Sequence, residues 1–215
     1  MMRISYLALW LCLLSPVTAL SVTSAGSSGS KVILFMGDSL TAGYGLDPSQ
    51  AFPALIREKI NSRQWKFEVI NAGQSGETSA GGLRRIEWLL QRKIDILVLE
   101  LGANDGLRGI DVEVTRRNLQ AIVDRTKERY PNVRIVLVGM QVPPNLGPVY
   151  AGKFRSIFFS LARKNQTLLV PFLLAGVGGV PGLNLPDGMH PTSEGHKILA
   201  KNVWKVLEPL LRSLR

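Results

Sequence analysis

Five short apolar runs, separated by longer amphipathic stretches, dominate the pattern of this chain. The runs are rich in Val, Ile and Leu and occupy residues 32–36, 67–70, 94–101, 133–138 and 167–170. Continuous apolar runs of this kind are typical of parallel strands that are covered on both faces. The sequence therefore predicts a parallel sheet of five strands.

Helical patterning fills the gaps between these runs, over residues 50–63, 79–92, 111–129, 150–165 and 192–213. The last stretch has an apolar face made by Leu199, Val203, Val206 and Leu210. Strands that alternate with helices favour right-handed βαβ crossovers. We expect an α/β fold, a three-layer α/β/α sandwich, and the length of 215 residues suits one domain, placed over residues 31–213.

The N-terminal residues do not fit this pattern. Met1–Arg3 gives a short positive start, Ile4–Leu14 is apolar and uncharged, and small residues follow with candidate cleavage sites at Ala19 and Ala25. This layout is typical of a secretory signal peptide. We expect a signal peptide over residues 1–25, followed by a flexible leader over 26–30 and a periplasmic or secreted location.

An uncleaved membrane anchor is the alternative for this segment, because Ile4–Val22 is nearly long enough to span a bilayer. Pro16 and the small polar residues after it favour cleavage. The only cysteine, Cys12, lies inside the segment, so the mature chain would have neither disulfides nor cysteine-based chemistry.

The net charge of +10 comes from basic residues scattered as short pairs, most of them on predicted helices. Solvated helix faces explain such a distribution best. Attraction to an anionic substrate, or a transient contact with a membrane surface, is the second interpretation. No aromatic residues interleave with the charge, so nucleic-acid binding is not expected.

Glycine and polar residues gather directly after the predicted strands. Ligands of an open parallel sheet bind at the carboxyl ends of its strands, which makes these residues candidates for a site. The segments are Gly37-Asp38-Ser39-Leu40, Asn71-Ala72-Gly73-Gln74, Gly102-Ala103-Asn104-Asp105 and Asp187-Gly188-Met189-His190.

A serine hydroxyl is a weak nucleophile unless a base accepts its proton. The chain has two histidines, and His190 follows Asp187 by three residues in a loop. That spacing lets the carboxylate hold one ring nitrogen while the other faces Ser39. The second histidine, His196, is expected to be a surface or packing residue, and Asp38 is assigned to loop structure. Three further acidic residues stay unassigned: Glu77, Glu100 and Asp105.

These motifs together resemble the GDSL, or SGNH, hydrolase family over nearly all of residues 31–213. Gly37-Asp38-Ser39-Leu40 resembles its first block, with Ser39 as the nucleophile, and Gly73 matches the glycine of the second. Asn104 matches the asparagine of the third block, and the last block is matched by Asp187 and His190. The resemblance is to small bacterial arylesterases and multifunctional acyl-thioesterase/lysophospholipases. It implies a flavodoxin-like SGNH hydrolase fold with strand order 2-1-3-4-5.

An acyl-transfer intermediate carries an oxyanion that needs aimed hydrogen-bond donors. The candidates are the backbone N–H groups of Ser39 and Gly73 and the side-chain amide of Asn104; the implied strand order places the last two on either side of Ser39. Taken singly, a glycine after a strand is usually a turn and an Asn-Asp pair usually caps a helix. Because Gly73 and Asn104 occur together with Ser39, Asp187 and His190, the sequence favours their role in an oxyanion hole.

Two uncharged loops rich in glycine and proline, Gln141–Pro148 and Phe172–Pro186, follow the fourth and fifth strands. They either line a groove for an acyl chain or pack over the end of the sheet. With the resemblance, they predict a monomeric enzyme that hydrolyses acyl or aryl esters or thioesters, including lysophospholipids. No metal or organic cofactor is expected.

Two other functions remain open on the sequence. The same site would serve an O-deacetylase or acyltransferase of envelope polysaccharide, although the apolar loops disfavour sugars. Glycine-rich loops at helix starts also suit a non-catalytic module that binds anions. The set of Ser39, Asp187 and His190 disfavours that module.

Overall fold

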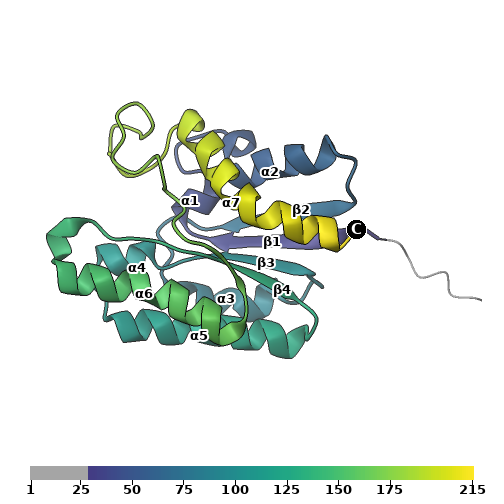
Figure 1. Cartoon of the computed structure of the whole chain (residues 1–215), viewed down its shortest axis with the longest axis horizontal. Helices are drawn as coiled ribbons and strands as arrows, with labels where there is room; N and C mark the ends of the chain where they lie inside the picture. The colour runs from purple at the N-terminus through teal and green to yellow at the C-terminus, as the bar shows by residue number, and fades with distance from the viewer. Residues whose placement is uncertain (1–28) are drawn as a thin grey trace, which may run out of the picture.

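A five-stranded parallel sheet lies at the centre of the computed structural model, which describes residues 29–215 (Figure 1). The strands run in the order β2-β1-β3-β4-β5, so the predicted fold and the implied strand order are confirmed. The expected signal peptide and residues 26–28 of the expected leader lie outside the described residues. The strands are β1 (Lys31–Gly37), β2 (Phe67–Gly73), β3 (Ile96–Glu100), β4 (Arg134–Val138) and β5 (Leu168–Val170).

Helices cover both faces of the sheet, as a three-layer sandwich requires (Figure 1). One face carries α2 (Phe52–Asn61) and α7 (Ser193–Ser213), which pack against each other. The other carries α3 (Ser79–Leu89), α5 (Val112–Arg129) and α6 (Pro148–Asn165), with α5 between its neighbours. Four short elements complete the order: α1 (Ser39–Ala42), α4 (Ala103–Leu107) and the 3₁₀ turns η1 (Pro48–Gln50) and η2 (Pro144–Leu146).

The ends of the strands differ from the predicted runs in ways that matter for the site. β2 extends to Gly73, which pairs with Gly37 at the end of β1, so both strands end side by side. β3 begins at Ile96 rather than residue 94. The side chain of Asp95, just before it, contacts β1: its Oδ2 accepts from the Val32 N–H at 2.8 Å.

The core lies between the sheet and both helical layers. Every residue of β3 is buried, which explains why its run is continuous rather than alternating. The predicted apolar face of α7 is also confirmed: Leu199, Val203 and Leu210 are buried and Val206 is half-buried. Buried side chains of this size each contribute about 1.5–3 kcal/mol to folding, so the sheet edge that carries the polar motifs rests on a rigid support.

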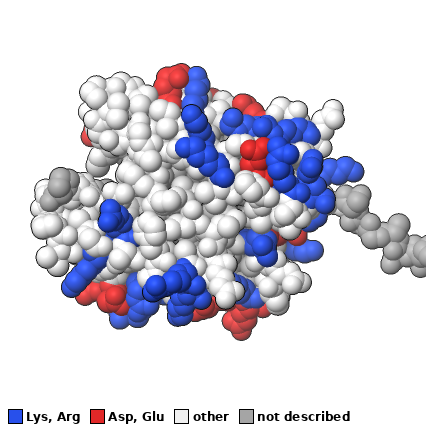
Figure 2. Space-filling view, viewed as in Figure 1, with Lys and Arg blue, Asp and Glu red and all other residues white. Residues whose placement is uncertain are grey.

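Basic side chains lie in separate groups beside acidic ones, rather than in one continuous patch, on the face shown in Figure 2. In the described part of the chain, several basic side chains form ion pairs on helices, as Arg116 does with Glu113 and Lys197 with Glu194. On this face the distribution favours the solvated-helix interpretation of the net charge. Within residues 29–215, no helix is long and apolar enough to cross a membrane.

Candidate active site

The residues singled out by the sequence meet at the carboxyl edge of the sheet. Ser39 opens α1 directly after β1, Gly73 ends β2, and Asn104 lies in α4 directly after β3. Asp187 and His190 lie in the loop between β5 and α7. Segments distant in the sequence therefore converge because parallel strands end at a common edge.

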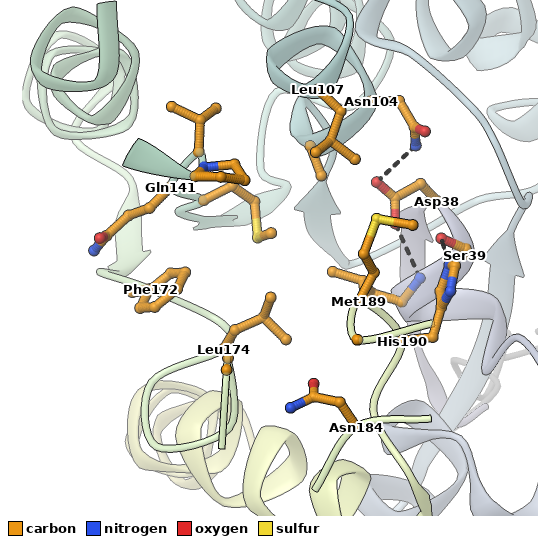
Figure 3. Close-up of a pocket in the computed structure, with 18 residues that line it drawn as sticks. Asp38, Ser39, Asn104, Leu107, Gln141, Phe172, Leu174, Asn184, Met189 and His190 are labelled. Carbon is orange, nitrogen blue, oxygen red and sulfur yellow. Dashed lines mark hydrogen bonds between the residues drawn. The ribbon is translucent and has the colours of Figure 1, made fainter. Parts of the chain in front are cut away.

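Ser39, His190 and Asp187 form a continuous chain of hydrogen bonds. His190 Nε2 lies 3.0 Å from Ser39 Oγ, and Figure 3 shows the two side chains next to each other. His190 Nδ1 lies 2.6 Å from Asp187 Oδ2. The carboxylate thus engages one ring nitrogen and leaves the other to the serine hydroxyl, the geometry of a base held in one orientation.

A tight turn fixes Asp187 relative to His190. Asp187 Oδ1 accepts from the backbone N–H groups of Met189 at 2.9 Å and His190 at 3.0 Å. Gly188 adopts a φ of 71°, which favours glycine at that position. The backbone and ring donors of His190 hold the pKa of Asp187 down at about 2, so this carboxyl is ionised at neutral pH.

Tyr44 covers the imidazole of His190, a contact that the sequence did not reveal. The two ring centroids lie 4.4 Å apart with an interplanar angle of 37°. Tyr44 itself is 51% exposed, so it partly covers the site from the solvent side. A tilted aromatic ring at this distance limits the motion of the imidazole, and no local pattern in the sequence marks such a contact.

The turn that carries Ser39 is fixed from both ends. Asp38 caps α1 by accepting from the Leu40 N–H at 2.9 Å, and Gly43 ends the helix in the left-handed region with a φ of 81°. Asp38 is completely buried, so it serves the loop, as expected, from beneath the turn. No described residue accepts from the Ser39 N–H, which leaves this donor available to a ligand.

The other two expected oxyanion donors are engaged within the protein. The Gly73 N–H donates to Asn71 Oδ1 at 2.9 Å. Asn104 Nδ2 donates to the Glu77 carbonyl at 3.0 Å and to Asp38 Oδ2 at 3.2 Å (Figure 3). An oxyanion would therefore share the Asn104 side-chain N–H groups with the Glu77 carbonyl and Asp38, or displace one of these two acceptors. It could bind the Gly73 N–H only after that group leaves Asn71 Oδ1.

An ion pair supports the loop between these two donors. Arg85 and Glu77 form a salt bridge, and the Glu77 side chain is only 3% exposed. Arg85 also donates to the carbonyls of Ala72 at 2.7 Å and Gly37 at 3.4 Å, at the ends of β2 and β1. The sequence left Glu77 unassigned, and the structure makes it the anchor of the segment that holds Asn104.

A second buried carboxylate ties α4 to the start of α3. Asp105, also unassigned from the sequence, accepts from the Ser79 N–H at 2.7 Å and from the Ser79 hydroxyl. Because Asp105 directly follows Asn104, this contact fixes the backbone on which the Asn104 amide is carried. No group of three or more metal-ligating side chains occurs in the described part of the chain.

His196 is a packing residue rather than a surface one. It is 1% exposed, and its Nδ1 accepts from the Phe52 N–H at 3.1 Å, which caps α2. Burial, with a contribution from the charge of His190, lowers the pKa of His196 to about 4. It is therefore neutral at the pH at which a histidine base would work.

A cavity of about 490 Å³ opens beside Ser39 and His190 (Figure 3). Both uncharged loops contribute to it, so they line the site rather than only packing over the sheet. Its volume lies in the range usual for small-molecule sites. The apolar side chains that line it are Leu40, Ala103, Leu107, Met140, Val142, Pro143, Phe172, Leu174 and Met189.

Comparisons with known proteins agree with this arrangement. The model of the GDSL-like Lipase/Acylhydrolase family matches residues 35–198. The chain is 41% identical to the esterase TesA of Pseudomonas aeruginosa over 185 residues, 86% of this chain and 91% of that protein. It is 34% identical to thioesterase 1/protease 1/lysophospholipase L1 of Escherichia coli, over 91% of this chain and 92% of that one.

A solved structure shares the fold as well as the sequence. The psychrotrophic esterase EstA from Pseudoalteromonas sp., in a structure inhibited by monoethylphosphonate, superposes with a TM-score of 0.80. It is 33% identical, and the match covers 85% of this chain and 100% of that one. The fold, the site and these relatives define the protein as an ester hydrolase. The chain belongs to the GDSL-like lipase/acylhydrolase family.

Proposed function

We propose that this chain is a serine esterase that hydrolyses carboxylic esters or thioesters through an acyl-enzyme intermediate. The observation that carries the proposal is the chain of hydrogen bonds from Ser39 Oγ through His190 to Asp187, opening onto an apolar cavity. Membership of a family of acylhydrolases supports the same reaction class.

The proposed reaction has two steps. Ser39 Oγ attacks the carbonyl carbon while His190 Nε2 takes the hydroxyl proton, which it then gives to the departing alcohol or thiol. His190 next takes a proton from water, whose oxygen attacks the acyl carbon, and the acid leaves as Ser39 regains its proton. Asp187 stabilises the imidazolium that forms in each step.

The oxyanion hole of the proposed reaction consists of the Ser39 N–H, the Gly73 N–H and the Asn104 amide. The free Ser39 N–H is the donor that needs no rearrangement. The bond from Asn104 to Asp38 is the longer of its two at 3.2 Å, and it is the one we expect the oxyanion to share or replace. One such donor is worth about 3–4 kcal/mol of transition-state stabilisation.

The substrate is proposed to carry an acyl or aryl group that fits the apolar cavity. Apolar side chains such as Leu107, Met140 and Phe172 outnumber the polar Gln141 and Asn184 in the lining, which disfavours the envelope-polysaccharide alternative. The names of the relatives, esterase and thioesterase 1/protease 1/lysophospholipase L1, extend the range to thioesters and lysophospholipids. The family membership disfavours a non-catalytic module.

We further propose that the protein acts as a monomer of one domain, residues 31–213, in the periplasm or outside the cell. The signal-peptide pattern of residues 1–25 supports export. The intact mass of protein recovered from the expected compartment tests this location, because cleavage after Ala19 or Ala25 leaves a mature chain of defined mass.

Hydrolysis of a short and a long p-nitrophenyl acyl ester tests the proposed reaction. We expect the mature protein to hydrolyse both and Ser39→Ala to hydrolyse neither. Ser62→Ala, an exposed serine at the end of α2, is the matched control and should hydrolyse both at the normal rate. Equal activity of Ser39→Ala and the unmodified protein, with circular dichroism unchanged, would contradict the assignment of the nucleophile.

A further inference from the structure

A second carboxyl group lies beneath the serine turn, and the proposed reaction does not use it. Glu100 is the last residue of β3, and in the sheet it pairs with Gly37, directly before Asp38 and Ser39. Glu100 and Asp38 are 1% and 0% exposed. Two buried carboxyls therefore lie together under the residue that we assign as nucleophile.

The two carboxyls hold the turn and the Asn104 amide together. Glu100 Oε2 accepts from Thr41 Oγ1 at 2.8 Å and from the Asp38 N–H at 3.2 Å. Asp38 in turn accepts from the Leu40 N–H and from Asn104 Nδ2. Glu100 is thus connected to the proposed oxyanion donor Asn104 through Asp38, and to the turn that carries Ser39 through Thr41.

Gly37, the residue before Asp38, packs directly against the Glu100 carboxyl and leaves no room for a side chain. A Cβ atom on Gly37 would lie 2.5 Å from Glu100 Oε2 and 2.1 Å from Thr41 Oγ1. Neither distance is tolerable for a carbon atom. The first residue of the Gly-Asp-Ser-Leu motif is therefore glycine because the Glu100 carboxyl and its Thr41 partner occupy the space of a side chain.

The lack of a salt-bridge partner among the described residues determines how many protons the carboxyls of Asp38 and Glu100 carry. Within residues 29–215, no lysine or arginine forms a salt bridge with Asp38 or Glu100, and Glu100 Oε1 is buried without a hydrogen-bond partner. Two adjacent buried carboxylates that form no salt bridge with lysine or arginine repel each other and lose their hydration, so one of the two carboxyls keeps its proton.

The proton is expected on Glu100 rather than on Asp38. Burial and the neighbouring Asp38 raise the pKa of Glu100 well above its usual range. Burial raises the pKa of Asp38 only to about 6, because the Leu40 N–H, Glu100, His190 and Asn104 all favour its ionised form. Asp38 therefore carries the single negative charge at neutral pH.

We propose that Glu100 is a positioning residue: as a neutral carboxylic acid it holds the Asp38 backbone and Thr41, so that one negative charge rather than two lies beneath Ser39 and Asn104. This proposal rests on the esterase function proposed above. A second negative charge there would oppose the oxyanion that Asn104 is proposed to stabilise. The bonds from the Asp38 N–H and Thr41 Oγ1 to Glu100 also fix the backbone from which the Asp38 carboxylate reaches Asn104.

Infrared difference spectroscopy tests the protonation without any need for activity. At neutral pH, we expect the unmodified protein to show the carbonyl stretch of a buried carboxylic acid, shifted in D₂O and absent from Glu100→Gln. Asp105→Asn, which changes another fully buried carboxyl of the same sheet edge, should keep the band. A spectrum without the band, or a band that persists in Glu100→Gln, would overturn the proposal.

The kinetics of two variants of similar side-chain size test the positioning role. Glu100→Gln keeps a neutral side-chain oxygen that can accept from Thr41 Oγ1 and the Asp38 N–H, whereas Glu100→Leu keeps no acceptor. We expect kcat to fall less than about tenfold in the first and about 10²-fold in the second, with KM changed little in both. Equal kcat in the two variants, or a loss confined to KM, would overturn the role.

The two measurements separate this proposal from the proposed function. If the unmodified protein hydrolyses no ester, the esterase function fails, and the infrared band still decides whether Glu100 is protonated. If esters are hydrolysed but the band is absent, only the role of Glu100 fails. Should Glu100→Leu not fold, the infrared spectra of the unmodified protein and Glu100→Gln remain decisive.

Discussion

Replacement of His196 by asparagine should change how the stability of this protein depends on pH. His196 is buried at the start of α7 and accepts from the Phe52 N–H through Nδ1. The side-chain oxygen of asparagine can accept from the same N–H but does not titrate. The variant therefore keeps the cap on α2 and removes the ionisable group.

The size of the effect follows from the pKa of His196, which burial lowers from 6.5 to about 4. Folding favours the neutral ring, so below pH 6.5 the unfolded chain binds a proton that the folded protein excludes. Stability is thus fully present above pH 6.5 and is lost as the pH falls toward 4. At one proton and 1.36 kcal/mol per pKa unit, the loss reaches roughly 2 kcal/mol at pH 5 and about 3 kcal/mol below pH 4.

Urea unfolding of the unmodified protein and His196→Asn at pH 8 and pH 5 measures this difference. Asp38 changes stability in the opposite direction, because its raised pKa makes the folded state bind a proton more readily between about pH 6 and 4. That contribution is common to both proteins and cancels in the comparison. We expect His196→Asn to gain roughly 2 kcal/mol relative to the unmodified protein on going from pH 8 to pH 5. A difference independent of pH would refute the argument that His196 is held neutral by burial.

Three further changes test other parts of the site. Asn104→Ala removes one proposed oxyanion donor and should lower kcat about 10²–10³-fold with little change in KM; steady-state kinetics that show a loss only in KM would contradict this role. Asp187→Asn keeps the side-chain size but cannot hold His190 in the required tautomer, so kcat should fall about 10³–10⁴-fold while circular dichroism stays unchanged; near-normal turnover would remove Asp187 from the mechanism. Arg85→Met leaves the buried Glu77 carboxylate without its cation and should destabilise the protein by about 3 kcal/mol, measured by urea unfolding; an unchanged midpoint would show that the ion pair contributes nothing.

The strands of the sheet were predictable because a strand buried on both faces leaves a continuous apolar run. β1, β3 and β4 each match such a run, and the strand order came from the family resemblance. The short helix α4 was not predicted, since its five residues are too few to show a helical period. The ends of β2 and β3 were displaced from the runs because pairing with neighbouring strands, not local sequence, decides where a strand stops.

The site was predictable only where its residues lie in short motifs. Ser39, Asp187 and His190 were identified in this way, and the structure brings them into hydrogen-bonding distance. Tyr44 and Arg85 were missed because their contacts join segments that no local pattern connects. Glu100 did leave a signal: it lies near the end of a run that, apart from Asp95 at its start, is otherwise apolar, and a buried carboxyl there needs an explanation.

The central claim is that Ser39 becomes acylated during turnover, and rapid-quench mass spectrometry tests it most directly. The mature protein is mixed with a p-nitrophenyl acyl ester, quenched in acid within the first turnovers and digested. The account predicts that the mass of one acyl group is added to the peptide that contains Ser39 and that it is absent from Ser39→Ala. An acyl group on another residue, or hydrolysis without any acylated protein during a burst of p-nitrophenol, would contradict it.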